Sequence, residues 1–203
     1  MKSLSEIDTT SKRASRAVGF SWGEAEEIGK SVRLLELFGL PGIKNLNQYY
    51  HLKINQKFDN LNLIKENNIS EKNSYCPITL GIKFLDQIRS LEKFKQIKFN
   101  KVAFPLLMLS FLSRSSEIIG KKINVKFNDA EFLLNLNVNI ASNLLNNDCP
   151  INADNFEVNI IDNKDNFLDE DWRSLYKLSE QTFVEETDSL KQSAAGAGLT
   201  DND

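Results

Sequence analysis

Residues 121–138, KKINVKFNDAEFLLNLNV, decide the fold class, because apolar and polar residues alternate along them. The alternation runs from Ile123 to Phe127 and returns from Phe132 to Val138. A period of two places successive side chains on opposite faces of a β-strand. The intervening Asn128-Asp129-Ala130 is typical of a turn, so the stretch predicts a β-hairpin.

Downstream of the hairpin, Phe156, Val158 and Ile160 alternate in the same way and predict a third antiparallel strand. The acidic run Asp169-Glu170-Asp171 then suits the first turn of a last helix, where carboxylates favour the helix dipole. The buried side of that helix is expected to carry Trp172, Leu175, Tyr176 and Phe183.

Upstream of the hairpin the period is helical. The segment from Val102 to Ile119, ended by Gly120, is too long for one strand and predicts a central buried helix. Pro77 suits the first position of another helix, which runs through about Leu91. The apolar face of this second helix is expected to hold Ile78, Ile82, Leu85 and Ile88.

Weaker patterns connect these elements. A short strand is expected from Gln96 to Phe99, and a short helix near Asn45–Leu52, followed by mostly irregular chain as far as Ser74.

The first 42 residues predict a helical hairpin. Ser3 with Glu6, and Ser21 with Glu24, have the spacing of the capping box that begins a helix. The first helix extends to Gly19, and the second ends at Gly39-Leu40-Pro41-Gly42, where a glycine and a proline stop it. Helices followed by a small sheet indicate an α+β fold. We expect one domain over residues 1–203, about three antiparallel strands, a C-terminal helix and a Gly/Ala tail at 193–203.

Composition excludes several classes of protein. The 203 residues include 25 Lys plus Arg and 28 Asp plus Glu, which gives a net charge of -3. This charge balance produces no positive electrostatic field that would attract nucleic acid or an anionic membrane. The longest apolar run, Val102–Leu112, is shorter than the roughly 20 residues of a spanning helix. The acidic N-terminus lacks the apolar region of a signal peptide. We therefore expect a soluble, cytoplasmic protein.

The corner between the first two helices is a candidate ligand site. Arg13 and Arg16 lie one turn apart, close to the helix start at Ser21-Trp22. Two arginines beside free N–H groups suit a carboxylate or phosphate. The structural alternative is an aromatic plug in a tight turn, and both alternatives predict that Phe20 and Trp22 are at least partly buried.

The C-terminal tail is the second candidate. Gly196 and Gly198 permit close backbone approach, and Asp201, Asn202 and Asp203 offer oxygens to a cationic group. The alternative is a frayed chain end, which is common for small residues at a terminus.

At these two places the chain resembles a family. The stretch RASRAVGFSWGEAEEIGKSVRLLELFGLPG, residues 13–42, and the ending AGAGLTDND, residues 195–203, are similar to a bacterial family of uncharacterised proteins, domain of unknown function 3726. Ser15 and Ala17-Val18 stand where the family motif has Ala and Gly-Ala. The resemblance implies that the tail matters for function, and it implies no activity or cofactor.

The two cysteines and the single histidine provide little chemistry. Cys76 precedes Pro77 at a helix start, a setting that favours a thiolate, but nothing in the sequence brings His51 to it. We predict that Cys76 is structural. Cys149 lies in a polar loop, and a metal site is not expected. Glu26 and Glu27 are adjacent on a helix and therefore do not form a paired site.

Two functions remain open. The first is an enzyme, or enzyme subunit, of small-molecule metabolism with its pocket near the N-terminal corner and the tail. The second is a non-catalytic assembly or ligand-binding module whose tail docks in a partner protein. The expected partners are a small anionic or zwitterionic ligand or another protein, with no nucleic acid and no membrane.

Overall fold

The computed structural model describes residues 2–144 and 149–183. The chain divides into two units, Met1–Asn163 and Lys164–Asp203. The expectation of a single domain stays a prediction. The fold class is α+β, as predicted, with six α-helices and a six-stranded mixed sheet in the described part of the chain. None of the described helices is long and apolar enough to cross a membrane.

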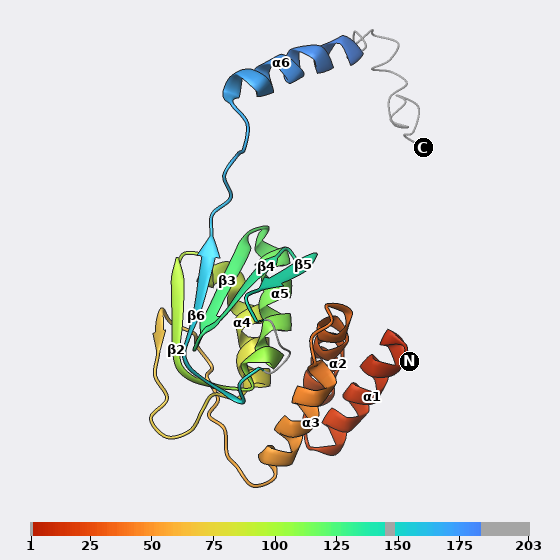
Figure 1. The fold of residues 1–203 in the computed structure, drawn as a ribbon, viewed down its shortest axis with the longest axis vertical. Helices are drawn as coiled ribbons and strands as arrows, with labels where there is room; N and C mark the ends of the chain where they lie inside the picture. Colours follow the sequence, from red (N-terminus) through yellow and green to blue (C-terminus); the bar gives the residue numbers. More distant parts are fainter. Residues whose placement is uncertain (1, 145–148, 184–203) are drawn as a thin grey trace, which may run out of the picture. The chain divides into compact units, whose positions relative to one another are not determined.

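Three helices form the N-terminal part of the first unit (Figure 1). They are α1 (Leu4–Ala17), α2 (Trp22–Leu37) and α3 (Gly42–Lys53). Both predicted capping boxes are present, with Ser3 and Ser21 as the capping residues. Gly39 adopts a positive φ of 72° directly after α2, which confirms the predicted stop. The predicted helix at 45–52 is also confirmed, and it begins earlier, at Gly42.

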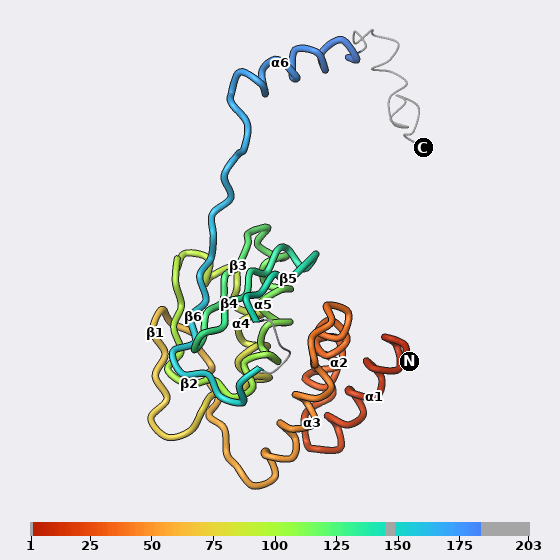
Figure 2. Tube along the Cα trace, in the orientation of Figure 1, coloured from red at the N-terminus to blue at the C-terminus, as the bar shows by residue number. Residues whose placement is uncertain are grey.

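The six strands have the order β1-β2-β6-β3-β4-β5. Strand β6 lies in the middle of the sheet, antiparallel to both β2 and β3, while β1 is a two-residue edge strand parallel to β2 (Figure 2). The bounds are β1 Asn67–Asn68, β2 Gln96–Ala103, β3 Lys122–Phe127, β4 Ala130–Asn135, β5 Asn139–Ser142 and β6 Asn152–Ile161. The expectation of about three strands was therefore too low, because β1 and β5 are short and carry no apolar alternation.

The hairpin prediction is confirmed for β3 and β4, but its second strand ends earlier than expected. Leu136 and Asn137 have positive φ values of 49° and 59° and turn the chain after Asn135. The predicted strand residue Val138 belongs to this turn and is exposed. The alternation of Leu136 and Val138 with asparagine therefore reflects a tight turn into β5.

The helix predicted for Val102–Ile119 is α5, which begins at Pro105. Val102 and Ala103 pair with β6 and end strand β2, so their assignment to the helix was wrong. Between strand and helix, Phe104 is fully buried with φ 43° and ψ 59°, a left-handed conformation that is rare for a side chain of this size. Its N–H donates to the carbonyl of Ile151 at 2.6 Å. This one residue converts an extended strand into a helix, a change that apolar periodicity does not reveal.

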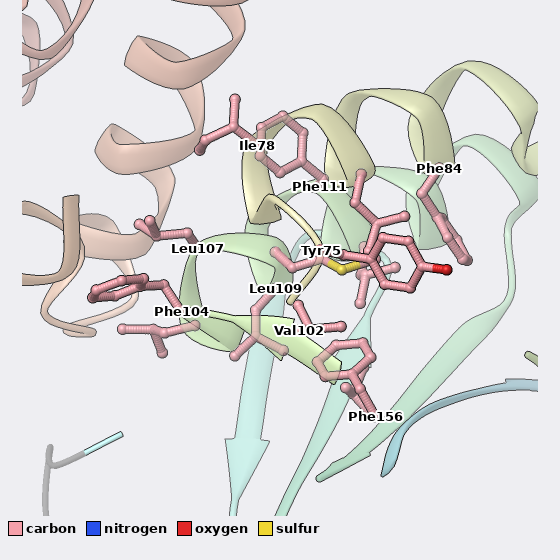
Figure 3. Packing of buried hydrophobic residues seen from close by; sticks show 14 of the residues in the cluster. Tyr75, Ile78, Phe84, Val102, Phe104, Leu107, Leu109, Phe111 and Phe156 are labelled. Atoms are coloured by element: carbon pink, nitrogen blue, oxygen red, sulfur yellow. The ribbon is translucent and has the colours of Figure 1, made fainter. Parts of the chain in front are cut away.

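Helices α4 (Pro77–Leu91) and α5 (Pro105–Ile119) pack against each other and cover one face of the sheet. Figure 3 shows apolar side chains of both helices, including Phe84 and Phe111, which belong to the same buried cluster as Phe156 of β6. Ile78 and Ile88 are buried as predicted, but Ile82 and Leu85 are only half-buried. The true contact face is centred on Gly81 and Phe84.

Gly81 allows the two helices to approach closely. A Cβ atom at this position would lie 2.3 Å from Cδ2 of Phe111. Only a residue without a side chain fits under this ring, so the α4–α5 contact depends on a glycine.

The second unit contains α6 (Asp169–Ser179), followed by a 3-10 turn at Glu180–Thr182. The predicted helix is present, but the prediction of a buried side was wrong. Trp172, Leu175, Tyr176 and Phe183 are all exposed, and no described residue of α6 is buried. The acidic first turn and the apolar period make a helix, but they do not supply a surface to cover it.

Candidate functional site

A groove between α1 and α3 has a volume of about 390 Å³. We call it the α1–α3 groove. Its walls are mostly apolar, with some polar and charged side chains among them. The lining residues are Lys2, Glu6, Ile7, Thr10, Ser11, Ala14, Ile43, Lys44, Leu46, Asn47 and Tyr50.

Helical spacing explains why these residues meet. Ile7, Ser11 and Ala14 are four and three residues apart, so they share one face of α1. On α3, Ile43, Leu46 and Tyr50 follow the same spacing. The small side chains on α1 leave room that larger residues would fill. The groove therefore exists because a face with small residues lies opposite a face with large ones.

Tyr50, which is buried, is one of the residues that line the groove. The hydroxyl of Ser15 donates to the carbonyl of Ser11 at 2.6 Å, and its oxygen lies 2.5 Å from the hydroxyl of Tyr50. Because the Ser15 proton is directed to Ser11, Tyr50 is the donor in this second bond. The hydroxyl is thus tied to α1, and the aromatic ring faces the cavity.

Burial raises the pKa of Tyr50 to about 12, although the hydrogen bond with Ser15 acts in the opposite direction. Tyr50 therefore stays protonated at neutral pH. A tyrosine in this state offers an aromatic surface and a donor, and it does not serve as a general base.

The rim of the groove carries charges of both signs. The ammonium group of Lys2 lies 3.7 Å from a carboxylate oxygen of Glu6, and both side chains are largely exposed. The backbone N–H of Ser3 donates to Glu6 at 2.8 Å, and this bond is the main reason why the pKa of Glu6 lies below its ordinary value. Lys44 adds a second lysine. Glu6 is thus engaged in the capping box, and two lysines and one glutamate are the charged residues among the described groove lining.

The residues predicted at the α1–α2 corner lie away from this groove. The guanidinium of Arg16 donates to the carbonyl of Phe20 and lies 4.7 Å from the ring centroid of Trp22. Arg13 is exposed, and Ser21 is the N-cap of α2. Phe20 is buried as predicted, at 5% exposure, but Trp22 is 60% exposed, so its predicted burial was wrong.

The position of Trp22 explains this difference. It occupies the first turn of α2 and points into solvent, while Phe20, just before the N-cap, packs near Tyr50 with ring centroids 6.2 Å apart. Phe20 therefore fills the corner between α1 and α2, and Trp22 covers Arg16. The predicted tail residues Gly196, Gly198, Asp201, Asn202 and Asp203 lie outside the described residues.

Cys76 is buried at the N-cap of α4, and its sulfur lies 3.0 Å from the hydroxyl of Tyr49. His51 is exposed on α3. The buried sulfur agrees with the prediction of a structural cysteine, and its reactivity stays untested. Burial raises the pKa of the half-buried Cys149 to about 12, which disfavours a thiolate there.

The adjacent acids of α2 bind different partners, as predicted. Glu26 pairs with Lys12 at 2.8 Å. Glu27 pairs with Lys30 at 2.8 Å and with Arg114 of α5 at 2.6 Å. Glu27 therefore ties the N-terminal helices to the helix that covers the sheet, and it is not part of a carboxylate pair.

Sequence reasoning did not single out the α1–α3 groove. The detectable signal was the run of small residues Ser11, Ala14 and Ser15 on one helix, together with the spacing of Leu46 and Tyr50 on another. These two patterns become a site only when α1 and α3 are known to be neighbours, and no local pattern contains that information.

Residues 2–75 match the model of a family described as "Protein of unknown function (DUF3726)". The match spans α1 to α3, including the corner and both sides of the groove. It confirms the family resemblance to domain of unknown function 3726 over this part of the chain. No curated protein and no solved structure matches the chain.

Proposed function

We propose that the protein binds a small amphipathic molecule in the α1–α3 groove. The observation that carries this proposal is the cavity itself, about 390 Å³ in volume and mainly apolar, with charged residues at its rim. Small-molecule sites generally occupy about 300–1,000 Å³ and combine apolar walls with a few polar groups.

The walls favour an apolar body for the ligand. Ile7, Leu46 and Tyr50 line the groove. An aromatic ring or a short acyl chain of a ligand that packs against them is removed from water, which favours binding. A neutral sugar or another strongly polar molecule would leave its hydroxyl groups without partners along these walls.

The rim favours a negative group at one end of the ligand. Lys2 and Lys44 supply ammonium groups there, and Glu6 offers a place for a positive group in a zwitterion. The ligand class is therefore an aromatic or acyl carboxylate, sulfonate or phosphate, with or without an amine.

Binding is better supported than catalysis. Tyr50 stays protonated, and Glu6 is the only carboxylate among the described residues that line the groove. Its hydrogen bond from Ser3 holds it in the helix cap. The enzyme hypothesis stays a proposal that needs reactive groups from beyond the groove.

One fluorescent probe and two matched variants test the proposal. We expect 1-anilinonaphthalene-8-sulfonate, which has an aromatic body and a sulfonate, to bind saturably to the folded protein at one site. Ala14→Trp fills the groove and should weaken binding by about tenfold or more, equivalent to about 1.4 kcal/mol. Ala17→Trp is the control, because Ala17 is exposed on the same helix and does not line the groove. Equal effects of both variants would refute the groove as the site.

The rim is tested separately. Lys44→Glu should weaken binding of the sulfonate probe but leave the neutral N-phenyl-1-naphthylamine within about twofold, because only the first carries a charge to repel. Loss of both probes together would show that Lys44→Glu disturbs the groove itself, and the anionic part of the proposal would then be wrong.

The corner and tail form a second candidate site, favoured by the exposed Trp22 with Arg16 and Lys12 over its ring. There an anionic group would bind near Arg13; the tail residues proposed to take part, 196–203, lie outside the described residues. In a Trp172→Phe background, Trp22 is the single tryptophan, so its fluorescence reports binding of benzoate or phosphate. Deleting Leu199–Asp203 should abolish that signal without changing the melting temperature. An unchanged signal after the deletion would remove the tail from the site.

A further inference from the structure

Helix α6 and its flanking residues expose several large apolar side chains on one side, while the exposed Leu178 lies on another side. Leu168, Trp172, Leu175, Tyr176 and Phe183 are each more than half exposed. Together with Ser179 they form what we call the α6 stripe. Phe167 stacks on Trp172 with ring centroids 5.8 Å apart and extends the apolar surface at one end. Large aromatic and leucine side chains grouped on one exposed helix face are typical of a protein-binding surface.

The spacing of the stripe is the same in both directions. From Leu168 the intervals to the next members are four, three, one, three and four residues. Two copies of the helix that run antiparallel therefore present the same pattern to each other. Such an arrangement is a two-fold symmetric interface, in which one patch is complementary to itself.

We propose that α6 pairs with α6 of a second copy of this chain, in antiparallel orientation, and so forms a homodimer. With the two-fold axis between Leu175 and Tyr176, Trp172 lies opposite Ser179 of the second copy, and Leu168 and Phe183 flank the paired helices. The largest side chain thus meets the smallest member of the stripe, which is how facing helices interdigitate.

The charges beside the stripe are compatible with this pairing. Arg173 and Glu180 lie on the same flank of the helix, seven residues apart. In an antiparallel pair the same flanks face each other. With the axis between Leu175 and Tyr176, Glu180 of the second copy lies two residues along the helix from the position opposite Arg173, a distance that the long Arg173 side chain can span. The antiparallel orientation also aligns the helix dipoles favourably.

An anionic membrane is a less suitable occupant of the stripe. Helices that lie on membranes carry Lys and Arg on their polar face. The first turn of α6 instead carries Asp169, Glu170 and Asp171, whose charges an anionic lipid surface repels.

The first test is the mass of the full-length chain in solution, by sedimentation velocity. We expect twice the 23.1 kDa of the chain, with a reversible concentration dependence. Leu175→Asp, at the centre of the stripe, should give a monomer at concentrations where the natural chain is a dimer. The control is Ser174→Asp, which places the same charge on the polar face of the same helix and should stay dimeric.

The second test concerns orientation and charge. In a Cys149→Ser background, Leu175→Cys lies near the two-fold axis and should cross-link under mild oxidation, whereas Leu168→Cys, far from the axis, should not. Arg173→Glu should weaken the dimer, and adding Glu180→Arg should restore it.

Several outcomes would overturn the proposal. The natural chain could stay monomeric, or Ser174→Asp could dissociate the dimer as much as Leu175→Asp does. Efficient cross-linking through Leu168→Cys, or a dimer that is not restored in the Arg173→Glu, Glu180→Arg variant, would also contradict it. A monomer that binds vesicles of phosphatidylserine would assign the stripe to a membrane instead. None of these variants touches the α1–α3 groove, so the proposed ligand binding is tested independently.

Discussion

Helices α4 and α6 have the same kind of amphipathic sequence pattern, but only α4 buries its apolar side. Pro77–Leu91 buries its apolar face against α5 and the sheet, and Ile78, Phe84 and Ile88 are almost fully buried. Asp169–Ser179 leaves every described side chain exposed. Both patterns predicted a buried face, and only the first prediction is confirmed.

The difference lies in what each helix has to pack against. At Gly81, α4 has a position without a side chain, so the Phe111 ring of α5 fits directly against its backbone. Helix α6 has no such close contact among the described residues. Periodicity shows that a helix has an apolar side, and steric fit with a second element decides whether that side is buried within the chain.

The largest expected effect comes from placing the same charge on both helices. Ile88→Asp in α4 buries an unpaired carboxylate and should reduce the free energy of unfolding by about 4 kcal/mol or more. Leu175→Asp in α6 should change it by less than about 0.5 kcal/mol, the usual range for a surface site. Urea denaturation at a concentration where both variants are monomeric measures the two values. Similar losses would show that α6 is also a core helix.

A smaller effect is expected at the glycine contact. Gly81→Ala forces the Phe111 ring to move and should destabilise the protein by about 1–3 kcal/mol. Gly23→Ala is the matched control, since a Cβ atom there meets nothing within 4 Å, and alanine favours the helix. If Gly81→Ala is neutral in thermal melts, close approach does not distinguish α4 from α6.

The half-buried ion pair between Glu27 of α2 and Arg114 of α5 extends the comparison to a polar contact. Burial raises the pKa of Glu27, but hydrogen bonds from Lys30 and Arg114 outweigh this effect and hold the pKa below its ordinary value of 4.5. The stabilisation is therefore present above about pH 4.5 and is lost as the pH falls through the folded-state pKa. Glu27→Gln should cost about 1–2 kcal/mol at pH 7 and progressively less toward pH 3.

Glu26→Gln serves as the control for this titration. Its partner Lys12 is near the surface, and the Glu26 side chain is half exposed, so a much smaller and salt-sensitive loss is expected. A pH dependence of the Glu27→Gln difference that rises toward pH 3 would contradict the assigned direction.

The smallest expected effect concerns Trp22, an aromatic residue that the sequence predicted to be at least partly buried. A buried tryptophan would cost about 3–5 kcal/mol when truncated to alanine. Because Trp22 is exposed and covers Arg16, Trp22→Ala should cost only about 0.5–1 kcal/mol, the value of an exposed cation–π contact. A loss above about 2 kcal/mol in thermal melts would show core packing after all.

Much of the fold could be predicted because its signals are local. The capping boxes at Ser3 and Ser21, the stop at Gly39 and the alternation of β3 and β6 each depend on a few neighbouring residues. The strands β1 and β5 lack such a signal. Asn67 and Asn68 form a strand only because β2 offers them a free edge.

The candidate site could be predicted far less well. The groove needs α1 beside α3, and the Ser15–Tyr50 hydrogen bond joins residues 35 positions apart. The conformation of Phe104 depends on a hydrogen bond to Ile151, which lies even further away in the sequence. Long-range pairings of this kind are fixed by packing, and no short pattern encodes them.

Strand β6 also determines how the first unit responds to mechanical load. It is hydrogen-bonded on both sides, to β2 and to β3, and the chain leaves its end at Ile161 toward the second unit. The bonds of antiparallel strands lie perpendicular to the strand axis. A pull applied at Lys164 along that axis therefore loads them in shear and together, whereas an edge strand such as β5 would peel away one bond at a time. Any tension that the second unit transmits thus reaches the sheet through a strand that is bonded on both sides.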